Sequence, residues 1–381
     1  MEGEMSKIRV LHVLSAMDLG GIESFIMAVF RELDKSRIQF DFAINVEHKT
    51  YFHDEIIKLG GRIFIHPHPK EGLVKYNSAL QETLKQQGPY DVVHVHSYLF
   101  NGNVLEIAAK QGIPIRISHS HTVRDRRKSN FKRKIYRYLM RKKIDKYATH
   151  LLGCSKLACE TLYTKKNFED QRIAVIKNGI NLSVFQNNDK DFLKQHLNLQ
   201  DDTKIIGHIG RFAEVKNHKL VIKAFNSMLL NDKKNSSHYH LVLVGDGEEL
   251  VNIQEMVREY KIQDKVSFLG KRDDIAKIMA GLDLLIFPSF HEGLGIVLVE
   301  AQASNVPCLI SNGVAKDAII VDSLIDVEDL SKDEEVWGKR ALEILERPKN
   351  DSRFTIDLVR QNGYDIRSVT QTLEKMYHNE E

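Results

Sequence analysis

The chain has 381 residues, of which 42% are hydrophobic and 28% charged, and its formal net charge is +3 at pH 7. This length predicts two domains, and the apolar content excludes a disordered protein because it is enough to form cores. No stretch approaches the ~20 apolar residues of a membrane-spanning helix. The three cysteines lack metal-ligand spacing, which indicates reduced thiols, and the acidic N-terminal residues do not resemble a signal peptide. We therefore expect a cytoplasmic protein.

The first half of the chain alternates strands with helices. A buried strand at residues 8–14 is followed by the Gly20–Gly21 turn and a helix with apolar residues at helical spacing. Further strands are predicted at residues 40–46, 62–66, 92–95, 115–118 and 150–155, with helices such as 52–59 and 76–87 between them. This alternation predicts a parallel sheet, whose ligands bind at the carboxyl ends of the strands. The Gly20–Gly21 turn either lets a phosphate or sugar approach the backbone or only reverses the chain, and it lacks the full dinucleotide-binding pattern.

Four histidines fall at the ends of two of these strands: His94, His96, His119 and His121. Because the carboxyl ends of parallel strands form the ligand edge, we expect these imidazoles to face a substrate. His96 and His121 are the better candidates, since each is the last of its pair. The two H-x-H pairs are also compatible with a metal site or with buried structural histidines; we predict no metal.

A strongly basic segment follows at Arg124–Lys146. It contains twelve lysines or arginines and two aspartates, a net charge of +10 that leaves −7 for the remaining chain. Apolar residues recur within it at roughly helical spacing, at Phe131, Ile135, Tyr138, Leu139 and Ile144. A basic amphipathic helix is typical of elements that bind an anionic membrane surface, where each cation contributes about 1 kcal/mol. A solvated helix face or a nucleic-acid-binding patch are the alternatives, but no nucleic-acid-binding motif accompanies the segment and we expect no nucleic acid.

The second half resumes the alternation after a turn at Asn178–Gly179. A strand at residues 204–209 is followed by Gly210–Arg211, by Lys216 and by a helix at 220–229. Two cations beside a helix N-terminus are suited to holding a diphosphate, although two unrelated surface cations would give the same pattern. Later strands are predicted at residues 240–244, 266–268, 282–287 and 306–311, and charged helices at 334–345 and 368–377.

Two carboxylates flank the start of the helix that follows Phe287-Pro288. Glu292 precedes this helix and Glu300 lies eight residues further on, which at ~1.5 Å per helical residue separates them by roughly 12 Å. That separation is about the length of a nucleotide sugar from its ribose to its hexose. The helix N-terminus between them favours a diphosphate. Alternatively, Glu292 is only a capping acid and Glu300 an ordinary surface residue.

The stretch from Glu292 to Glu300 resembles the E-x7-E signature of the retaining glycosyltransferases of family 4. Gly20–Gly21, Asn178–Gly179 and the pair Arg211 and Lys216 resemble further landmarks of that family, in the same order along the chain. The resemblance implies an α/β protein with the GT-B fold, that is, two Rossmann-like domains with an interdomain cleft. Residues 1–180 would bind the acceptor, residues 181–365 the nucleotide sugar, and residues 366–381 would form a helix that crosses back to the first domain.

The resemblance also implies roles for individual residues. Arg211 and Lys216 would stabilise the departing diphosphate, Glu292 and a histidine would contact the hexose, and Glu300 would bind the ribose. The predicted catalytic residues are His121, Arg211, Lys216 and Glu292. The predicted substrate-binding residues are Gly20, Gly21, His96, His119, Asn178, Gly245, Lys271, Arg272, His291, Gly293, Leu294, Gly295 and Glu300.

The predicted activity is transfer of a hexosyl or N-acetylhexosaminyl group from a nucleotide sugar, most simply a UDP-sugar, with retention of configuration and without a cofactor or metal. The resemblance implies a lipid-linked saccharide as the acceptor, exopolysaccharide or cell-surface glycan synthesis as the context, and the inner face of the cell membrane as the location. A homo-oligomer is compatible with the sequence. The alternatives are a GT-B nucleotide-sugar epimerase and a non-enzymatic lipid- or RNA-binding protein on a degenerate fold.

Overall fold

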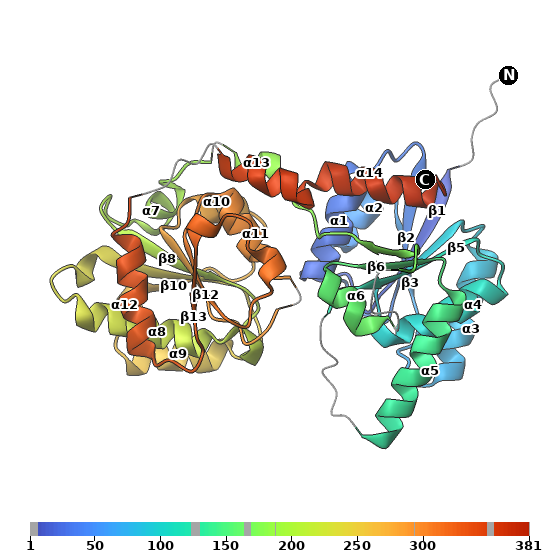
Figure 1. The fold of residues 1–381 in the computed structure, drawn as a ribbon, viewed down its shortest axis with the longest axis horizontal. Helices are drawn as coiled ribbons and strands as arrows, with labels where there is room; N and C mark the ends of the chain where they lie inside the picture. The colour runs from blue at the N-terminus through green and yellow to red at the C-terminus, as the bar shows by residue number, and fades with distance from the viewer. Residues whose placement is uncertain are drawn as a thin grey trace. The chain divides into compact units, whose positions relative to one another are not determined.

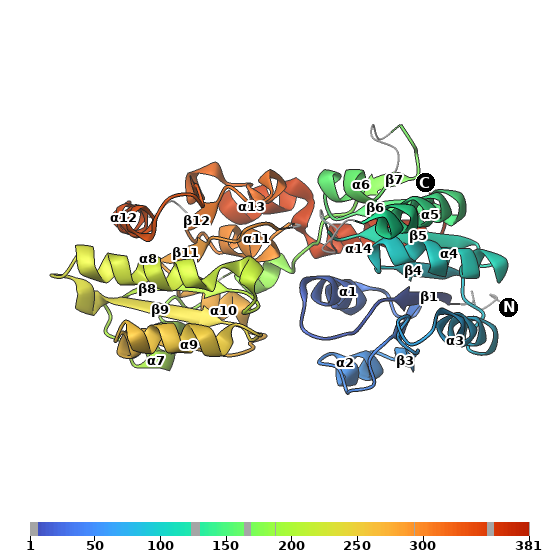
Figure 2. The same ribbon diagram turned by 90° about the horizontal axis from the view of Figure 1, so that it is seen from below.

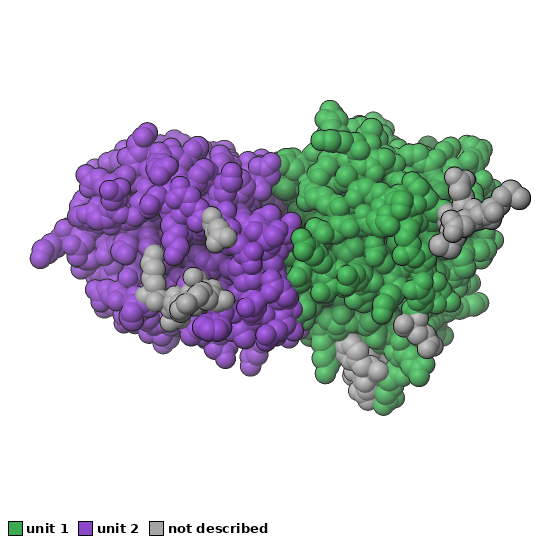
Figure 3. Space-filling view, turned by 90° about the horizontal axis from the view of Figure 1, so that it is seen from above, with its two compact units in different colours: residues 1–180, 363–381 green, residues 181–362 purple. Residues whose placement is uncertain are grey.

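A computed structural model describes residues 7–122, 130–163, 169–186, 188–292, 294–348 and 354–380. The chain divides into unit 1, residues 1–180 with 363–381, and unit 2, residues 181–362 (Figure 3). Each unit contains one parallel sheet, which confirms the prediction of an α/β protein with two Rossmann-like domains. None of the helices in the described ranges is long and apolar enough to cross a membrane.

Unit 1 is built on a seven-stranded sheet in the order β3-β2-β1-β4-β5-β6-β7, with every neighbouring pair parallel. Its strands are β1 Ile8–Val13, β2 Ile38–Ile44, β3 Arg62–Ile65, β4 Val92–Val95, β5 Ile115–Ser120, β6 His150–Gly153 and β7 Ile173–Val175. Its helices are α1 Gly21–Glu32, α2 His53–Lys58, α3 Leu73–Gln86, α4 Asn101–Lys110, α5 Phe131–Tyr147, α6 Lys156–Leu162 and α14 Ile366–Tyr377. The strand order reverses direction between β1 and β4, the point at which doubly wound sheets bind their ligands.

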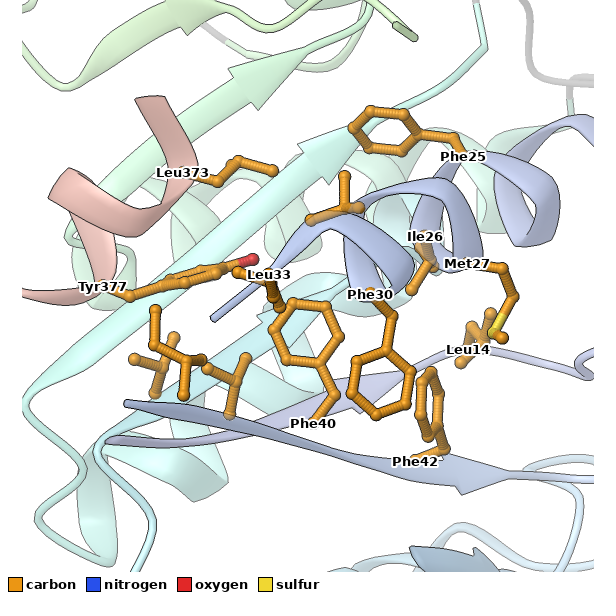
Figure 4. Packing of buried hydrophobic residues seen from close by; sticks show 14 of the residues in the cluster. Leu14, Phe25, Ile26, Met27, Phe30, Leu33, Phe40, Phe42, Leu373 and Tyr377 are labelled. Atoms are coloured by element: carbon orange, nitrogen blue, oxygen red, sulfur yellow. The ribbon is translucent and has the colours of Figure 1, made fainter. Parts of the chain in front are cut away.

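The core of unit 1 explains why residues 366–377 form a helix there. Helix α14 places Leu373 and Tyr377 in the same buried cluster as Phe30 of α1 and Phe40 of β2 (Figure 4). The Tyr377 and Phe40 rings meet edge to face with their centroids 5.9 Å apart, a favoured aromatic geometry. Because these buried residues recur on one side of the helix, α14 is amphipathic and packs against α1 on one face of the sheet (Figure 1).

Unit 2 is built on a six-stranded parallel sheet in the order β10-β9-β8-β11-β12-β13. Its strands are β8 Lys204–Ile209, β9 Tyr239–Val244, β10 Val266–Phe268, β11 Leu284–Phe287, β12 Cys308–Ser311 and β13 Ile325–Glu328. Its helices are α7 Phe192–Leu197, α8 His218–Asn231, α9 Leu250–Glu259, α10 Ile275–Ala280, α11 Ile296–Ala303, α12 Glu334–Leu345 and α13 Thr355–Val359. Helices α8 and α9 lie side by side over strands β8 and β9 (Figure 2). Here the strand order reverses between β8 and β11, so the ends of these two strands carry the candidate site.

Candidate active site

The ends of β8, β9 and β10 are joined closely by their backbones. The Gly210 N–H donates to the Val244 carbonyl, and the Gly245 N–H donates to the Gly270 carbonyl, both at 2.9 Å. A Cβ atom on Gly245 would lie 2.1 Å from the Gly210 carbonyl oxygen, and the φ angle of Gly245 is +138°. Only glycine fits such a position. Gly245 therefore allows the Gly210–Arg211 turn to pass directly over the end of β9.

Lys216 and Glu292 meet directly in unit 2. The Lys216 Nζ lies 2.7 Å from Oε1 of Glu292, and the two side chains are only 18% and 12% exposed. The same Nζ lies 4.9 Å from the centre of the Phe287 ring, within cation–π range. The Lys216 side chain runs beside Gly210. A Cβ atom built on Gly210 would lie 3.4 Å from the Cδ atom of Lys216. The cation and the carboxylate predicted to act on one ligand are thus neighbours in a partly dry environment, where charges interact more strongly than in water.

Backbone contacts fix the two loops that carry this pair. The Phe290 N–H donates to the Val215 carbonyl at 2.9 Å, and the Asn217 side-chain amide donates to the Pro288 carbonyl at 3.3 Å. Asn217 itself is in the left-handed region, with φ +54°, a conformation that asparagine tolerates better than most residues. The position of Lys216 relative to Glu292 therefore depends on loop backbone as well as on the ion pair.

Helix α11 begins beside this pair and carries Glu300. Gly295, with φ +77°, precedes its first residue and provides no side-chain cap, so the first N–H groups of the helix remain available for an anion. Burial raises the pKa of Glu300 to about 7. Within the described part of the chain, no hydrogen-bond donor or cation contacts the Glu300 carboxyl. Glu300 is only partly exposed, and a ligand hydroxyl would give its carboxyl the partner that it lacks.

The other predicted cations of unit 2 are already paired. Arg211 lies 3.1 Å from Glu248 with both side chains more than 60% exposed, and Lys271 lies 3.5 Å from Asp246. Arg272 donates two hydrogen bonds, of 2.8 and 2.6 Å, to Asp274 in its own loop. Contact of Arg272 with a nucleotide would require this ion pair to open, whereas Arg211 is exposed and can turn to an anion at little cost.

The remaining predicted residues of the loop around Glu292 differ in their exposure to solvent. His291 is partly exposed, whereas Leu294 is 4% exposed and packs inside unit 2. Leu294 therefore offers its backbone more readily than its side chain to a ligand. Gly293 lies outside the described residues, and its predicted contact remains a prediction.

Two histidines next to Lys216 were not singled out by the sequence motifs. His208 of β8 and His218 of α8 are buried, with ring centres 4.3 Å apart, and His218 stacks on Phe212 at 4.0 Å. Burial lowers the pKa of His208 to about 4 and that of His218 to about 2, helped in both cases by the nearby Lys216 charge. Both rings are therefore neutral at pH 7, which leaves Lys216 as the cation of this part of the site. The sequence signal that could have identified these two histidines is their position, on the strand before and on the helix after the Gly210–Arg211 turn.

In unit 1, the predicted glycine turn lies at the start of α1. Gly20 is the N-terminal cap and Gly21 the first residue of the helix, and a Cβ atom on Gly20 would lie 2.4 Å from Oε2 of Glu23. Because the end of the Glu23 side chain can move and a Cβ atom on Gly21 would meet nothing within 4 Å, packing alone does not require glycine at either position. Asn178 is 8% exposed, and its Oδ1 has no partner in the described ranges.

The predicted histidines form hydrogen-bonded chains inside unit 1. His96 Nδ1 lies 2.9 Å from His121 Nε2, and His94 Nε2 lies 3.1 Å from His119 Nδ1. His119 is completely buried and His96 is 7% exposed, while His121 is partly exposed. The expectation that all four imidazoles face a substrate is therefore not met by this structure: His119 presents no surface, and His121 is the ring nearest to solvent. The physical reason is that the sheet face they share is covered by α1 and α14.

Comparison with known proteins agrees with the fold and with its division into two parts. The model of the glycosyl transferases group 1 matches residues 189–351, and that of glycosyltransferase family 4 matches residues 19–184. The putative glycosyltransferase EpsF of Bacillus subtilis is 33% identical over 376 residues, covering 98% of this chain and 97% of EpsF. An Escherichia coli UDP-Gal:α-D-GlcNAc-diphosphoundecaprenol α-1,3-galactosyltransferase is 26% identical over 351 residues, 87% of each chain.

Solved structures show the same fold at low sequence identity. The structure of Anabaena HepE in complex with UDP and glucose aligns with a TM-score of 0.72 and 16% identity, covering 98% of this chain and all of HepE. The E-x7-E stretch, the Arg211 and Lys216 pair and the near full-length identity to EpsF lead to one conclusion. This chain belongs to the family 4 glycosyltransferases and has the GT-B fold.

Proposed function

We propose that the protein transfers a hexosyl or N-acetylhexosaminyl group from a UDP-sugar to a lipid-linked saccharide, with retention of the anomeric configuration and without a metal ion. Unit 2 binds the donor and unit 1 the acceptor, and the product enters exopolysaccharide or cell-surface glycan synthesis. The printed name of the E. coli relative supports these classes, since it names UDP-Gal and a diphosphoundecaprenol-linked acceptor. The UDP and glucose bound to HepE support the same type of donor.

The observation that carries the proposal is the arrangement of Lys216, Glu292 and the start of α11, with the unpaired Glu300 in the same helix. As the bond from the sugar C1 to the diphosphate breaks, negative charge accumulates on the leaving group. Lys216, Arg211 and the N-terminus of α11 stabilise that charge. Glu300 accepts hydrogen bonds from the ribose hydroxyls, and Glu292 contacts the hexose.

No carboxylate needs to act as a base in this scheme. Glu292 lies 2.7 Å from the Lys216 Nζ, so its carboxylate is already occupied by a cation and is not placed as a free base for the acceptor hydroxyl. The acceptor hydroxyl attacks C1 on the face that the diphosphate leaves, and its proton passes to a diphosphate oxygen. The anomeric configuration is then retained.

Calorimetry with UDP, followed by a thermal-shift screen of UDP-, GDP- and ADP-sugars, tests the donor. Wild-type protein should bind UDP, and Lys216→Ala should lose about 1.5–3 kcal/mol of affinity through loss of a charged contact. A matched control is Lys223→Ala, which removes an exposed lysine of α8 that pairs with Glu334. Equal UDP affinity in wild type and Lys216→Ala would contradict the proposal.

Stereochemistry and metal use are tested separately. The proton NMR spectrum of the first product formed from an α-linked donor should show an α-linkage, and a β-linkage would refute retention. Activity should survive dialysis against EDTA. Loss of activity that a divalent ion restores would refute the metal-free mechanism.

Helix α5 supports a peripheral location at an anionic membrane. Phe131, Ile135, Tyr138 and Leu139 are 77, 45, 57 and 49% exposed, although such residues are normally buried. The opposite side of the helix packs on α4 through Met140 and Ile144, and in Figure 1 the N-terminal end of α5 extends beyond α3 and α4. An apolar stripe beside lysines fits the boundary of lipid headgroups and acyl chains. The cations at 124–128 of the predicted basic segment lie outside the described residues.

Vesicle sedimentation tests this location. Wild-type protein should bind vesicles that contain phosphatidylglycerol, and the triple variant Lys132→Glu, Lys134→Glu, Lys142→Glu should not. The control reverses three exposed lysines of unit 2, Lys233, Lys234 and Lys332, and should bind normally. Persistent binding of the α5 variant would refute the membrane proposal without affecting the donor proposal.

A further inference from the structure

A chain of three imidazoles runs through the core of unit 1. His12 Nδ1 lies 3.0 Å from His96 Nε2, and His96 Nδ1 lies 2.9 Å from His121 Nε2. His12 and His96 are buried, and His121 follows the end of β5 and is partly exposed. The three residues come from three neighbouring strands or strand ends, β1, β4 and β5. The chain therefore links the middle of the sheet to the edge where ligands bind in this fold.

All three imidazoles are neutral at physiological pH. Burial lowers the pKa of His12 and of His121 to about 3, and it lowers the pKa of His96 well below its usual range, with the neighbouring histidines adding to the effect. A neutral imidazole has one N–H and one lone pair. Each ring in the chain must therefore donate in one direction and accept from the other. Only two arrangements satisfy both hydrogen bonds: every ring protonated on Nε2, or every ring protonated on Nδ1.

The surroundings of the inner end select between these arrangements. The Nε2 of His12 is buried and has no hydrogen-bond partner among the described residues. The His12 ring lies 4.2 Å from the Phe40 ring and 5.6 Å from the Phe42 ring, centre to centre. These rings offer no donor to a lone pair on Nε2, whereas an aromatic ring can accept an N–H weakly. This end of the chain therefore favours an N–H on the Nε2 of His12.

From this geometry we infer that His12 and His96 are positioning residues that fix His121 as a hydrogen-bond acceptor for a sugar hydroxyl. With Nε2 of His12 protonated, its Nδ1 accepts from His96 Nε2–H, and His96 Nδ1 accepts from His121 Nε2–H. The lone pair of His121 Nδ1 is then left at the outer end of the chain. That nitrogen is itself buried and has no partner within the described ranges, a deficit that a ligand hydroxyl would satisfy once the side chains over it move aside. The His121 ring lies 6.1 Å from Phe25 of α1, the helix that starts at the Gly20–Gly21 turn. The assignment of a sugar hydroxyl as the ligand rests on the proposed function.

A second chain beside the first provides an internal control. Tyr377 of α14 lies 3.0 Å from His94 Nδ1, and His94 Nε2 lies 3.1 Å from His119 Nδ1. The rings of the two chains stack, with His94 and His96 4.3 Å apart and His119 and His121 4.0 Å apart. Since the hydrogen bonds run within each chain, removal of the Tyr377 hydroxyl disturbs the second chain and leaves the direction of the first unchanged.

Metal binding is the competing use of these histidines. Two sets, His12 with His94 and His96, and His96 with His119 and His121, each bring one nitrogen per ring within 4.8 Å of the others. His96 belongs to both sets, and both of its nitrogens already take part in hydrogen bonds. An ion would have to break the chain at its centre. The hydrogen-bonded chain is therefore the arrangement that the observed contacts favour.

The experiment measures the tautomer of His121 directly, by long-range nitrogen–proton NMR of the full-length protein labelled with ¹⁵N-histidine. Protonated and unprotonated ring nitrogens have well-separated ¹⁵N shifts, and the His121 signals are identified by their loss in His121→Asn. In wild type we expect Nε2 of His121 to be protonated and Nδ1 unprotonated at pH 7.5, after dialysis against EDTA. A protonated Nδ1, an imidazolium, or metal-type shifts that appear on addition of Zn²⁺ at one equivalent would each overturn the inference.

A pair of variants then tests the role of the inner residue. His12→Leu removes the acceptor for His96, so the His121 signals should shift toward those of the other tautomer. Tyr377→Phe, which changes a buried neighbour by one hydroxyl, should leave them unchanged. Unchanged His121 signals in folded His12→Leu would overturn the positioning role, and the wild-type spectrum alone decides the tautomer if this variant does not fold. Because no substrate is present, failure of the proposed function would appear separately, in UDP calorimetry.

Discussion

Glu300 makes the nucleotide affinity of this protein depend on pH. Glu300 is only partly exposed and has no donor or cation at its carboxyl in the described structure, and desolvation raises its pKa to about 7. Ribose hydroxyls donate hydrogen bonds, and the ionised carboxylate accepts them better than the acid does. Binding therefore stabilises the charged form and lowers this pKa toward its usual value of about 4.5. Below pH 7 a proton must leave before UDP binds, so the affinity for UDP should fall as the pH falls.

The size of the effect follows from these two pKa values. With a pKa of about 7 in the free protein and about 4.5 in the complex, the affinity at pH 6 should be about tenfold lower than at pH 8, or about 1.4 kcal/mol. The buried charge also has a cost in the free protein. Because the folded pKa is raised, unit 2 binds more protons than the unfolded chain between about pH 4.5 and 7, and its stability contribution falls as the pH rises through that range.

Calorimetry with UDP at pH 6, 7 and 8 measures the first effect, and Glu300→Gln removes the titrating group. This variant should bind UDP more weakly at pH 8, lose the tenfold pH dependence, and unfold at a higher temperature in the absence of ligand. Glu335→Gln, at an exposed site on α12, is the matched control and should change none of these. Affinity that stays constant from pH 6 to 8 in wild type, or an unchanged pH dependence in Glu300→Gln, would refute the reasoning.

Three further predictions follow from buried groups. Gly245→Ala should destabilise unit 2 by more than 2 kcal/mol, because its Cβ atom would lie 2.1 Å from Gly210 O, whereas Gly270→Ala, with φ +64° and open space around it, should cost only about 1 kcal/mol in thermal unfolding; equal losses would contradict the packing argument. Urea unfolding of unit 1 should show lower stability at pH 5 than at pH 7, by about 2 kcal/mol for His12, since its pKa of about 3 lies below that of the unfolded chain; equal stability would argue against burial. Glu292→Gln should reduce turnover more than UDP affinity, which steady-state kinetics and calorimetry with UDP distinguish, and a loss confined to UDP affinity would reassign Glu292 to the nucleotide.

Hydrophobic periodicity was enough to predict most of the fold. The predicted strands and helices recur within a few residues of their observed bounds, because buried parallel strands are continuous apolar runs and the helices that cover them are amphipathic. Strand β13, Ile325–Glu328, was not predicted. It alternates with acidic residues at the sheet edge, and buried Asp326 is held by Arg340 and Arg347, which follow it by 14 and 21 residues. Ion pairs between residues far apart in sequence leave no local periodic signal.

The candidate site, too, could be predicted only where the signal is local in the sequence. Spacing alone placed Lys216 near a helix start and Glu292 before another, and their 2.7 Å contact depends on β8 and β11 being neighbours in the sheet. The histidines show where spacing is insufficient. An H-x-H pair places both rings on one face of a strand, but it does not reveal whether that face meets substrate or a covering helix. In this chain the answer lies more than two hundred residues away, in α14, whose Tyr377 covers His94 while His121 remains at the edge. Histidines that look equivalent in the sequence therefore differ in exposure and in role, because a segment far along the chain packs over some of them and not over others.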